Sequence, residues 1–340
     1  MRMSAVTSPS LQLLVVVLAL GGVNPACKAR PASERVYRLA EMNTEEIRAL
    51  DRERTVILIP GGIMEEHGPY LPSYSDGYQN ERYTADLAAT LARRPGWTVA
   101  VFPTIPLGSG GANAVGGKVP FPGTFAVRPE TLRAIFMDLG DEFGEQGFRW
   151  IFLMHIHGGS EHNRALDDAG EYFRDAYGGR MVNLGGLDTG SDPGLEAMRA
   201  SASKEALDEE GLSVHAGLLE TSRVMAARPD LVSPSVGTAP AITARDFPGM
   251  YRIAAGPNWP GYFGAPRYAT PDIGRRVFEG DTSLNVLMAS RLLDGQADER
   301  KINRVAAAME NPDLVKALER SIQRDAAIAK RQQDWIAGRR

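Results

Sequence analysis

Two short segments of this sequence place carboxylates and histidines just after apolar runs that are typical of buried strands. Residues 55–60, TVILIP, are followed closely by Glu65 and His67. Residues i and i+2 of an extended chain point to the same side, about 6–7 Å apart, so each of these two side chains is placed to bind one ion of a closely spaced metal pair. Asp76 is a candidate bridge between the ions, and Glu66 would face away. The alternative is that these residues are loop charges near a helix start.

The segment MHIHGG, residues 154–159, repeats the pattern at the end of another apolar run. His157, beside the two glycines, is the better candidate ligand. His155 is interpreted as a hydrogen-bonded structural residue, or as one that orients a ligand. His162 is interpreted as a surface or pocket-wall residue in the first turn of the next helix, and Ser160 as the N-cap of that helix rather than a nucleophile.

The third segment is SVHAGLLETS, residues 213–222. His215 precedes the apolar spacing of a helix, and Glu220 falls inside it. Residues five apart do not share a helical face, so His215 must lie before the regular helix if both side chains reach one site. A buried glutamate in an apolar helix needs a partner, and a metal ion or a metal-bound histidine would serve.

The elements that must position these residues alternate along the chain. Hydrophobic patterning predicts strands at 55–60, 97–108, 149–159 and 179–186, with helices at 80–94, 129–148, 161–177 and 272–293. Residues 108–123 are interpreted as a glycine-rich loop and residues 233–270 as a long ordered loop. Strands separated by helices indicate an α/β fold with a mostly parallel sheet covered on both faces. Ligands bind beyond the carboxyl ends of such strands, where the predicted site residues lie.

The composition and the N-terminal segment limit the other classes of function that this chain could have. The 340 residues carry a net charge of −4, and the absence of a long basic tract argues against a nucleic-acid partner. Residues 1–27, with a basic start and a short apolar core, predict an export signal and a periplasmic location. Cys27 is the single cysteine, which excludes an intrachain disulfide. A lipid on Cys27 would be the one route to the membrane, as in an anchored lipoprotein.

Taken together, these motifs resemble those of the creatininase (creatinine amidohydrolase) family. The segments that carry the resemblance are EEHGPYLP at 65–72 with Asp76, FPGT at 121–124, HGG at 157–159, HAGLLETS at 215–222 and FGAPRYATPDIG at 263–274. The resemblance covers about residues 45 to 295 in order. We therefore predict a creatininase-like domain at 36–295, preceded by the export segment and followed by a charged helical extension at 296–340.

The resemblance implies a three-layer α/β/α sandwich and a metal-dependent hydrolase of small non-peptide C–N bonds. It implies a small amide, cyclic amide or formamide as substrate, and a homo-oligomer, often a hexamer. Two divalent ions per subunit are expected, zinc or manganese by ligand type, with iron a third candidate. The expected metal ligands are Glu65, His67, Asp76 as the bridge, His157 and Glu220, with His215 as the catalytic histidine that shuttles a proton to the leaving nitrogen.

Departures from the family pattern leave the substrate open. Gly159 and Val214 stand where creatininases have glutamates, and His155 and Ser160 stand where many relatives have asparagines. Creatinine is therefore a poor guess. The alternatives are a short-peptide peptidase or a deformylase of the same fold, and a non-catalytic exported protein that binds metal or ligand. A structural metal site usually has fewer carboxylates, which argues against the last of these.

Overall fold

A computed structural model describes residues 36–339 of the chain. The predicted export segment, residues 1–27 with Cys27, lies outside the described residues. Within the described range, no helix is both long enough and apolar enough to cross a membrane.

The core of the protein is a five-stranded sheet in the order β1-β3-β2-β4-β5. Every neighbouring pair in it is parallel. All six residues of the central strand β2 are buried, which is expected where both faces of a parallel sheet are covered. The strands of this sheet are β1 (Val36–Arg38), β2 (Thr55–Pro60), β3 (Thr98–Val101), β4 (Trp150–Met154) and β5 (Arg180–Asn183).

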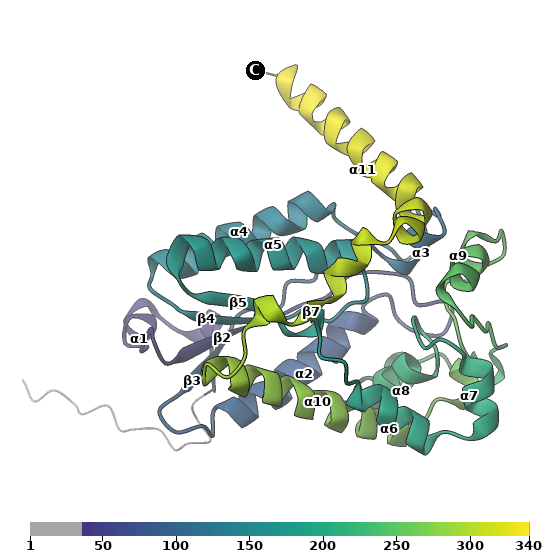
Figure 1. Ribbon diagram of the computed structural model, residues 1–340, viewed down its shortest axis with the longest axis horizontal. Coiled ribbons are helices and arrows are strands. Elements are labelled where there is room, and N and C mark those ends of the chain that lie inside the picture. The colour runs from purple at the N-terminus through teal and green to yellow at the C-terminus, as the bar shows by residue number, and fades with distance from the viewer. Residues whose placement is uncertain (1–35, 340) are drawn as a thin grey trace, which may run out of the picture.

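Helices cover both faces of the sheet and make three layers (Figure 1). On one face lie α2 (Ser75–Leu91) and α10 (Pro271–Leu293), whose Leu87 and Phe278 join a core with Phe152 of β4. On the other face lie α4 (Pro129–Glu145) and α5 (Ser160–Tyr177). The predicted α/β/α sandwich with a mostly parallel sheet is confirmed.

The predicted loop regions contain short helices that the sequence pattern did not indicate. The glycine-rich segment 108–123 includes α3 (Ala112–Val115), and the segment 233–270 includes α9 (Phe247–Ala255). The remaining α-helices of the described chain before its last segment are α1 (Thr44–Arg48), α6 (Pro193–Ser201), α7 (Lys204–Glu210) and α8 (Leu218–Ala227). The 97–108 strand is shorter than predicted and ends at Val101.

The C-terminal segment packs against the domain before its last helix projects from it. Its strand β7 (Asn303–Arg304) pairs antiparallel with β6 (Leu187–Asp188). Arg304 forms an ion pair with the buried Asp167 of α5. A 3-10 segment, η8 (Val305–Glu310), and the long helix α11 (Pro312–Ala337) follow. The first turns of α11 lie beside α3, whereas its later turns project away from the body (Figure 1).

Candidate metal centre

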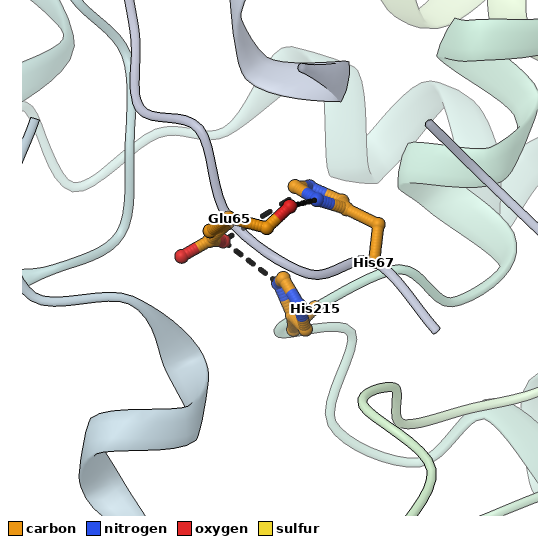
Figure 2. Close-up of side chains that lie close together, drawn as sticks. All are labelled: Glu65, His67 and His215. Carbon is orange, nitrogen blue, oxygen red and sulfur yellow. Dashed lines mark hydrogen bonds and ion pairs between the residues drawn. The ribbon is translucent and has the colours of Figure 1, made fainter. Parts of the chain in front are cut away.

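Six predicted site residues come together at the carboxyl edge of the sheet. Their positions in the fold are the loop after β2 for Glu65 and His67, the first turn of α2 for Asp76, the loop after β4 for His157, the loop before α8 for His215 and the first turn of α8 for Glu220. Figure 2 shows the carboxylate of Glu65 between the rings of His67 and His215. All of these side chains are buried except that of Glu220, which is 17% exposed. The structure therefore brings the predicted residues to one place.

The three histidines are oriented in the same way. Each ring has one nitrogen at hydrogen-bond distance from a backbone carbonyl, which only accepts, so that nitrogen carries the proton and donates it. The donors and acceptors are His67 Nδ1 to Glu65 O at 3.1 Å, His157 Nε2 to Gly110 O at 3.1 Å and His215 Nε2 to Glu66 O at 2.7 Å. A histidine binds a metal ion as the neutral ring, and in that form the second nitrogen of each of these rings is unprotonated. That nitrogen faces the carboxylates in all three cases.

Asp76 presents its two oxygens to two different histidines. Its Oδ1 lies 3.6 Å from His67 Nε2, and its Oδ2 lies 2.9 Å from His157 Nδ1. Glu220 Oε1 lies 3.5 Å from the same atom of His67, and Glu65 Oε1 lies 3.8 Å from the same atom of His157. Asp76 therefore lies between two groups of candidate ligands, one that includes His67 and one that includes His157.

The donor atoms fit divalent metal ions. Three groups have ligand atoms within 4.8 Å of one another, and they are His67, Asp76 and Glu220, then Glu65, Asp76 and His157, and then Glu65, His67 and His215. His67 Nε2 is buried without a hydrogen-bond partner, and its separations from carboxylate oxygens, 3.5 to 4.0 Å, exceed hydrogen-bond length. Two ligands of one ion at bonds of about 2.0–2.2 Å lie roughly 3–3.5 Å apart, close to the observed spacing.

Backbone and side-chain donors fix the carboxylates that face these histidines. The backbone N–H of Ala112 donates to Glu65 Oε2 at 3.1 Å. Glu220 accepts from the backbone N–H of Ala216 at 2.7 Å and from Gln79 Nε2 at 3.1 Å. One oxygen of Glu65 and both oxygens of Glu220 are therefore held by the protein. Such support orients ligands before an ion binds.

Burial and mutual charge shift the pKa values of these groups strongly. Burial raises the pKa of Glu65 to about 8. Burial alone would lower the pKa of His157, but the negative charges of Glu65 and Asp76 raise it to about 10. The pKa of His215 moves the other way, to about 4, because burial and the neighbouring His67 both disfavour its protonated form. His215 is therefore neutral at pH 7, with Nδ1 free to accept a proton.

The loop that carries His215 is held in a strained conformation. Ala216 has a φ of 52°, in the left-handed region that residues with a side chain rarely adopt. The buried carboxylate of Glu210 supports this loop by accepting from the backbone N–H groups of Leu218 at 2.9 Å and Ala265 at 2.7 Å. As predicted, His215 lies before the regular helix, and it shares the site with Glu220. Strain of this kind persists where the surrounding structure enforces it, often at functional sites.

The remaining histidines, His155 and His162, pack beside His157 and outside the groups of candidate ligands. His155 is fully buried, packs edge-on against Phe136, and fills the space beside Gly61, where any side chain would overlap its ring. His162 is also fully buried and stacks on His155, so its interpretation as a surface residue is wrong. Its burial follows from the glycine-rich loop, whose Ser109 N–H approaches His162 Nδ1 at 3.4 Å. Both rings stay neutral, because burial lowers their pKa values.

The predicted N-cap role of Ser160, in the turn after β4, is wrong. Ser160 is the first residue of α5 and its side chain accepts no capping hydrogen bond, because Gly159 occupies the N-cap position. A Cβ at Gly159 would lie 2.6 Å from Gly110 O and 2.6 Å from His157 Nε2. The hydrogen bond that orients His157 therefore leaves no room for a side chain here, and a glutamate would require this turn to move.

Glu66 faces away from the centre, as predicted, and accepts from Thr124 Oγ1.

A cavity of about 460 Å³ opens over the centre. Besides the metal-centre residues, its lining includes groups to which sequence reasoning assigned no role. These are Glu161 at the start of α5, Phe247 and Met250 of α9, and Leu314 and Leu318 of α11. An acidic residue in a first helical turn and apolar residues in an amphipathic helix are ordinary patterns, so no local signal distinguishes them.

Comparisons with known proteins show the family and the fold of this chain. A family model for creatininase, described as creatinine amidohydrolase, matches residues 40–283. The chain is 29% identical over 257 residues to the mycofactocin precursor peptide peptidase of Mycobacterium ulcerans (strain Agy99), covering 72% of this chain and 88% of the relative. A solved structure described as "Creatininase Mn" is 21% identical with a TM-score of 0.57, covering 77% of this chain and 100% of the other. A mutant creatininase of "Zn-Zn type" is 22% identical with a TM-score of 0.55, covering 77% and 98%.

Proposed function

This chain belongs to the creatininase family, and we propose that it is a metal-dependent amidohydrolase that cleaves a C–N bond of a small amide, cyclic amide or formamide. The proposed metal ligands are Glu65, His67, Asp76, His157 and Glu220, with two divalent ions per subunit. Zinc and manganese are the proposed metals. They suit the mixed imidazole and carboxylate donors, and they are named in the descriptions of two structures of this fold.

One observation carries the proposal. Each of the three histidines donates one N–H to a backbone carbonyl and turns its other nitrogen toward buried carboxylates. Buried carboxylates without cations are costly, and the two oxygens of Asp76 face separate histidines. When bound, the ions would supply a water of lowered pKa and polarise the substrate carbonyl.

His215 is proposed to move the proton. Its Nε2–H is held by the carbonyl of Glu66, which leaves Nδ1 unprotonated at 3.2 Å from Glu65 Oε1 and on the side of the centre. From there Nδ1 accepts the proton of the attacking water and delivers it to the leaving nitrogen. The Ala112 N–H, at 3.1 Å from the other oxygen of Glu65, keeps that carboxylate in place while this occurs.

The substrate is proposed to be an amide other than creatinine. A related mutant creatininase has been solved with creatine, but the turn at Gly159 has no room for the glutamate expected in true creatininases. Val214, where a second glutamate is expected, is a 38% exposed apolar residue on the cavity. The cavity wall therefore offers apolar surface where that glutamate would stand.

A peptidase that trims short peptides is the second candidate. The relative in Mycobacterium ulcerans bears the name of a precursor-peptide peptidase. The cavity of about 460 Å³ lies within the usual range for ligand pockets, and one or two residues of a peptide would occupy such a volume. The chemistry at the centre would be the same for both candidates.

Metal analysis combined with a substrate panel tests the proposal. The purified chain should bind close to two Zn²⁺ or Mn²⁺ per subunit, and His67→Ala should lower this stoichiometry. The metal-loaded protein should release amine or ammonia from members of a panel of small amides, lactams, N-formyl compounds and dipeptides. Wild-type protein that binds no metal under these conditions would refute the centre. Metal binding without turnover of any compound would favour the non-catalytic binding protein instead.

Assembly and location are further proposals. The projecting helix α11 exposes Val315, Ile322, Trp335 and Ile336, which is consistent with a homo-oligomer in which this helix meets another subunit. Light scattering of the purified protein would give the subunit number, with a hexamer proposed. Export to the periplasm, with or without a lipid on Cys27, would be tested by cell fractionation and by the mass of the mature chain.

A further inference from the structure

The wall of the cavity includes residues that follow the family match. That match ends at residue 283, whereas Val305, Ala308, Leu314 and Leu318 line the cavity over the metal centre. They belong to η8 and the first turns of α11, which lie over α5 and α3. Leu318 is 4% exposed. The C-terminal segment is therefore part of the candidate active site.

A second part of the cavity wall is also apolar and partly open. Phe247 and Met250 of α9 line it together with Phe263. Phe247 is 56% exposed although it borders the cavity. Large apolar side chains that stay exposed at the rim of a concave site commonly mark a binding surface for an apolar group.

One charged side chain lines the cavity without a partner. Glu161 is 8% exposed, and among residues 36–339 its carboxylate takes part in no hydrogen bond or ion pair. The charged groups that act on it are Asp325 of α11 and Glu130 of α4, both negative. A buried carboxylate that meets only like charges within the protein is suited to a cationic ligand.

The part of the cavity wall formed by Val305, Ala308, Leu314 and Leu318, here called the C-terminal wall, is anchored where it begins. Arg304 pairs with Asp167 of α5 directly before the first lining residue, Val305. The β7 strand that contains Arg304 pairs with β6. This attachment holds η8 against α5, the helix that carries Glu161, so the apolar wall and the carboxylate are fixed relative to each other.

We propose that Glu161 and the wall formed by Val305, Ala308, Leu314 and Leu318 select the substrate. The substrate carries a bulky apolar group next to the scissile amide and a cationic amine that pairs with Glu161. An aminoacyl amide or the free N-terminal residue of a short peptide has this chemistry. The inference rests on the proposed metal-dependent function and names the substrate class of the same centre.

Binding of three hydroxamates to the Mn²⁺-loaded chain, measured by calorimetry, tests this substrate class. Acetohydroxamate binds a metal centre with no recognition group. 3-Phenylpropanohydroxamate adds an apolar group, and L-phenylalanine hydroxamate adds an amine to that. We expect each addition to tighten binding by about 10-fold or more, in line with the selectivity of apolar pockets and of charged hydrogen bonds.

Matched variants separate the contribution of the apolar wall to binding from that of the Glu161 carboxylate. Leu314→Ala should weaken 3-phenylpropanohydroxamate about 10-fold and leave acetohydroxamate unchanged, whereas Val315→Ala, on the exposed side of the same turn, should change neither. Ala308→Phe, at an exposed position of the wall, should also weaken the aromatic probe by filling the cavity. Glu161→Gln should abolish the advantage of the amine, and Glu130→Gln, which does not line the cavity, should retain most of it.

The outcomes are distinguishable. If acetohydroxamate does not bind the metal-loaded wild type, the metal centre itself is wrong and this inference is overturned with it. If acetohydroxamate binds but the three probes bind equally, the centre stands and the substrate class is wrong. An amine advantage that survives in Glu161→Gln would show that the amine contacts the metal rather than this carboxylate, and would overturn the role of Glu161.

Discussion

Replacing Glu161 by glutamine is expected to stabilise the protein at alkaline pH. Burial, together with the negative charges of Asp325 and Glu130, raises the pKa of Glu161 from 4.5 to about 7. A carboxyl group whose pKa is higher in the folded chain favours folding only while it is protonated. Its contribution to the free energy of unfolding is complete below the unfolded pKa of 4.5 and is lost as the pH rises through about 7.

The magnitude follows from the size of the pKa shift. The rise from 4.5 to about 7 corresponds to about 3 kcal/mol at 1.36 kcal/mol per unit. Glutamine has nearly the shape of protonated glutamate and does not ionise. At pH 8 the free energy of unfolding of Glu161→Gln should therefore exceed that of the wild type by about 3 kcal/mol. At pH 5.5, where the folded protein still holds this proton, the gain should fall to about 1.5 kcal/mol.

Urea unfolding followed by tryptophan fluorescence measures this difference. Both proteins are unfolded at pH 5.5 and at pH 8 with EDTA present, so that metal binding does not contribute. Glu130→Gln is the control, because it removes a nearby but exposed carboxylate and should change stability by no more than about 0.5 kcal/mol. A variant that is no more stable than the wild type at pH 8, or a gain that does not depend on pH, would refute the reasoning.

Three further predictions concern the metal centre. His215→Ala should keep its metal content but lose on the order of 100-fold in turnover, and a fully active variant would rule out its proton-transfer role. Mn²⁺ or Zn²⁺ at 100 times its dissociation constant should stabilise the EDTA-treated chain by about 2.7 kcal/mol in calorimetric melts; Asp76→Asn should lose most of this effect, and an unchanged response would contradict the bridge. Gly159→Ala, whose Cβ would meet His157 Nε2 at 2.6 Å, should lower metal affinity about 10- to 100-fold; unaltered affinity would show that the turn relaxes freely.

The position of the centre was predictable because it follows from parallel sheet topology. Strands β2 and β4 are neighbours and run in the same direction, so the residues that follow them meet at one edge of the sheet. Glu65 and His157 are such residues. The apolar runs before them are long enough to identify as strands without any knowledge of tertiary contacts, and the histidine that ends each motif is then placed by the chain direction alone.

The burial of His162 and of Glu161 was not predictable in the same way. Both lie in the first helical turn of α5, where charged residues are ordinarily exposed and favoured by the helix dipole. They are buried because other segments fold over them, the glycine-rich loop over His162 and the C-terminal segment over the cavity that Glu161 lines. These contacts join residues that are far apart in sequence, and nothing in the local pattern records them.

The residues proposed to select the substrate and those proposed to cleave it lie in different parts of this chain. The residues proposed to bind metal and move the proton lie within the family match at 40–283, so their arrangement would serve any amide that reaches them. Leu314 and Leu318, which lie beyond that match, close one side of the cavity. Because the substrate must fit between this wall and α9, the substrates of relatives do not determine the substrate here. The C-terminal wall is therefore the part of the molecule in which substitutions should change which amide is cleaved without changing how it is cleaved.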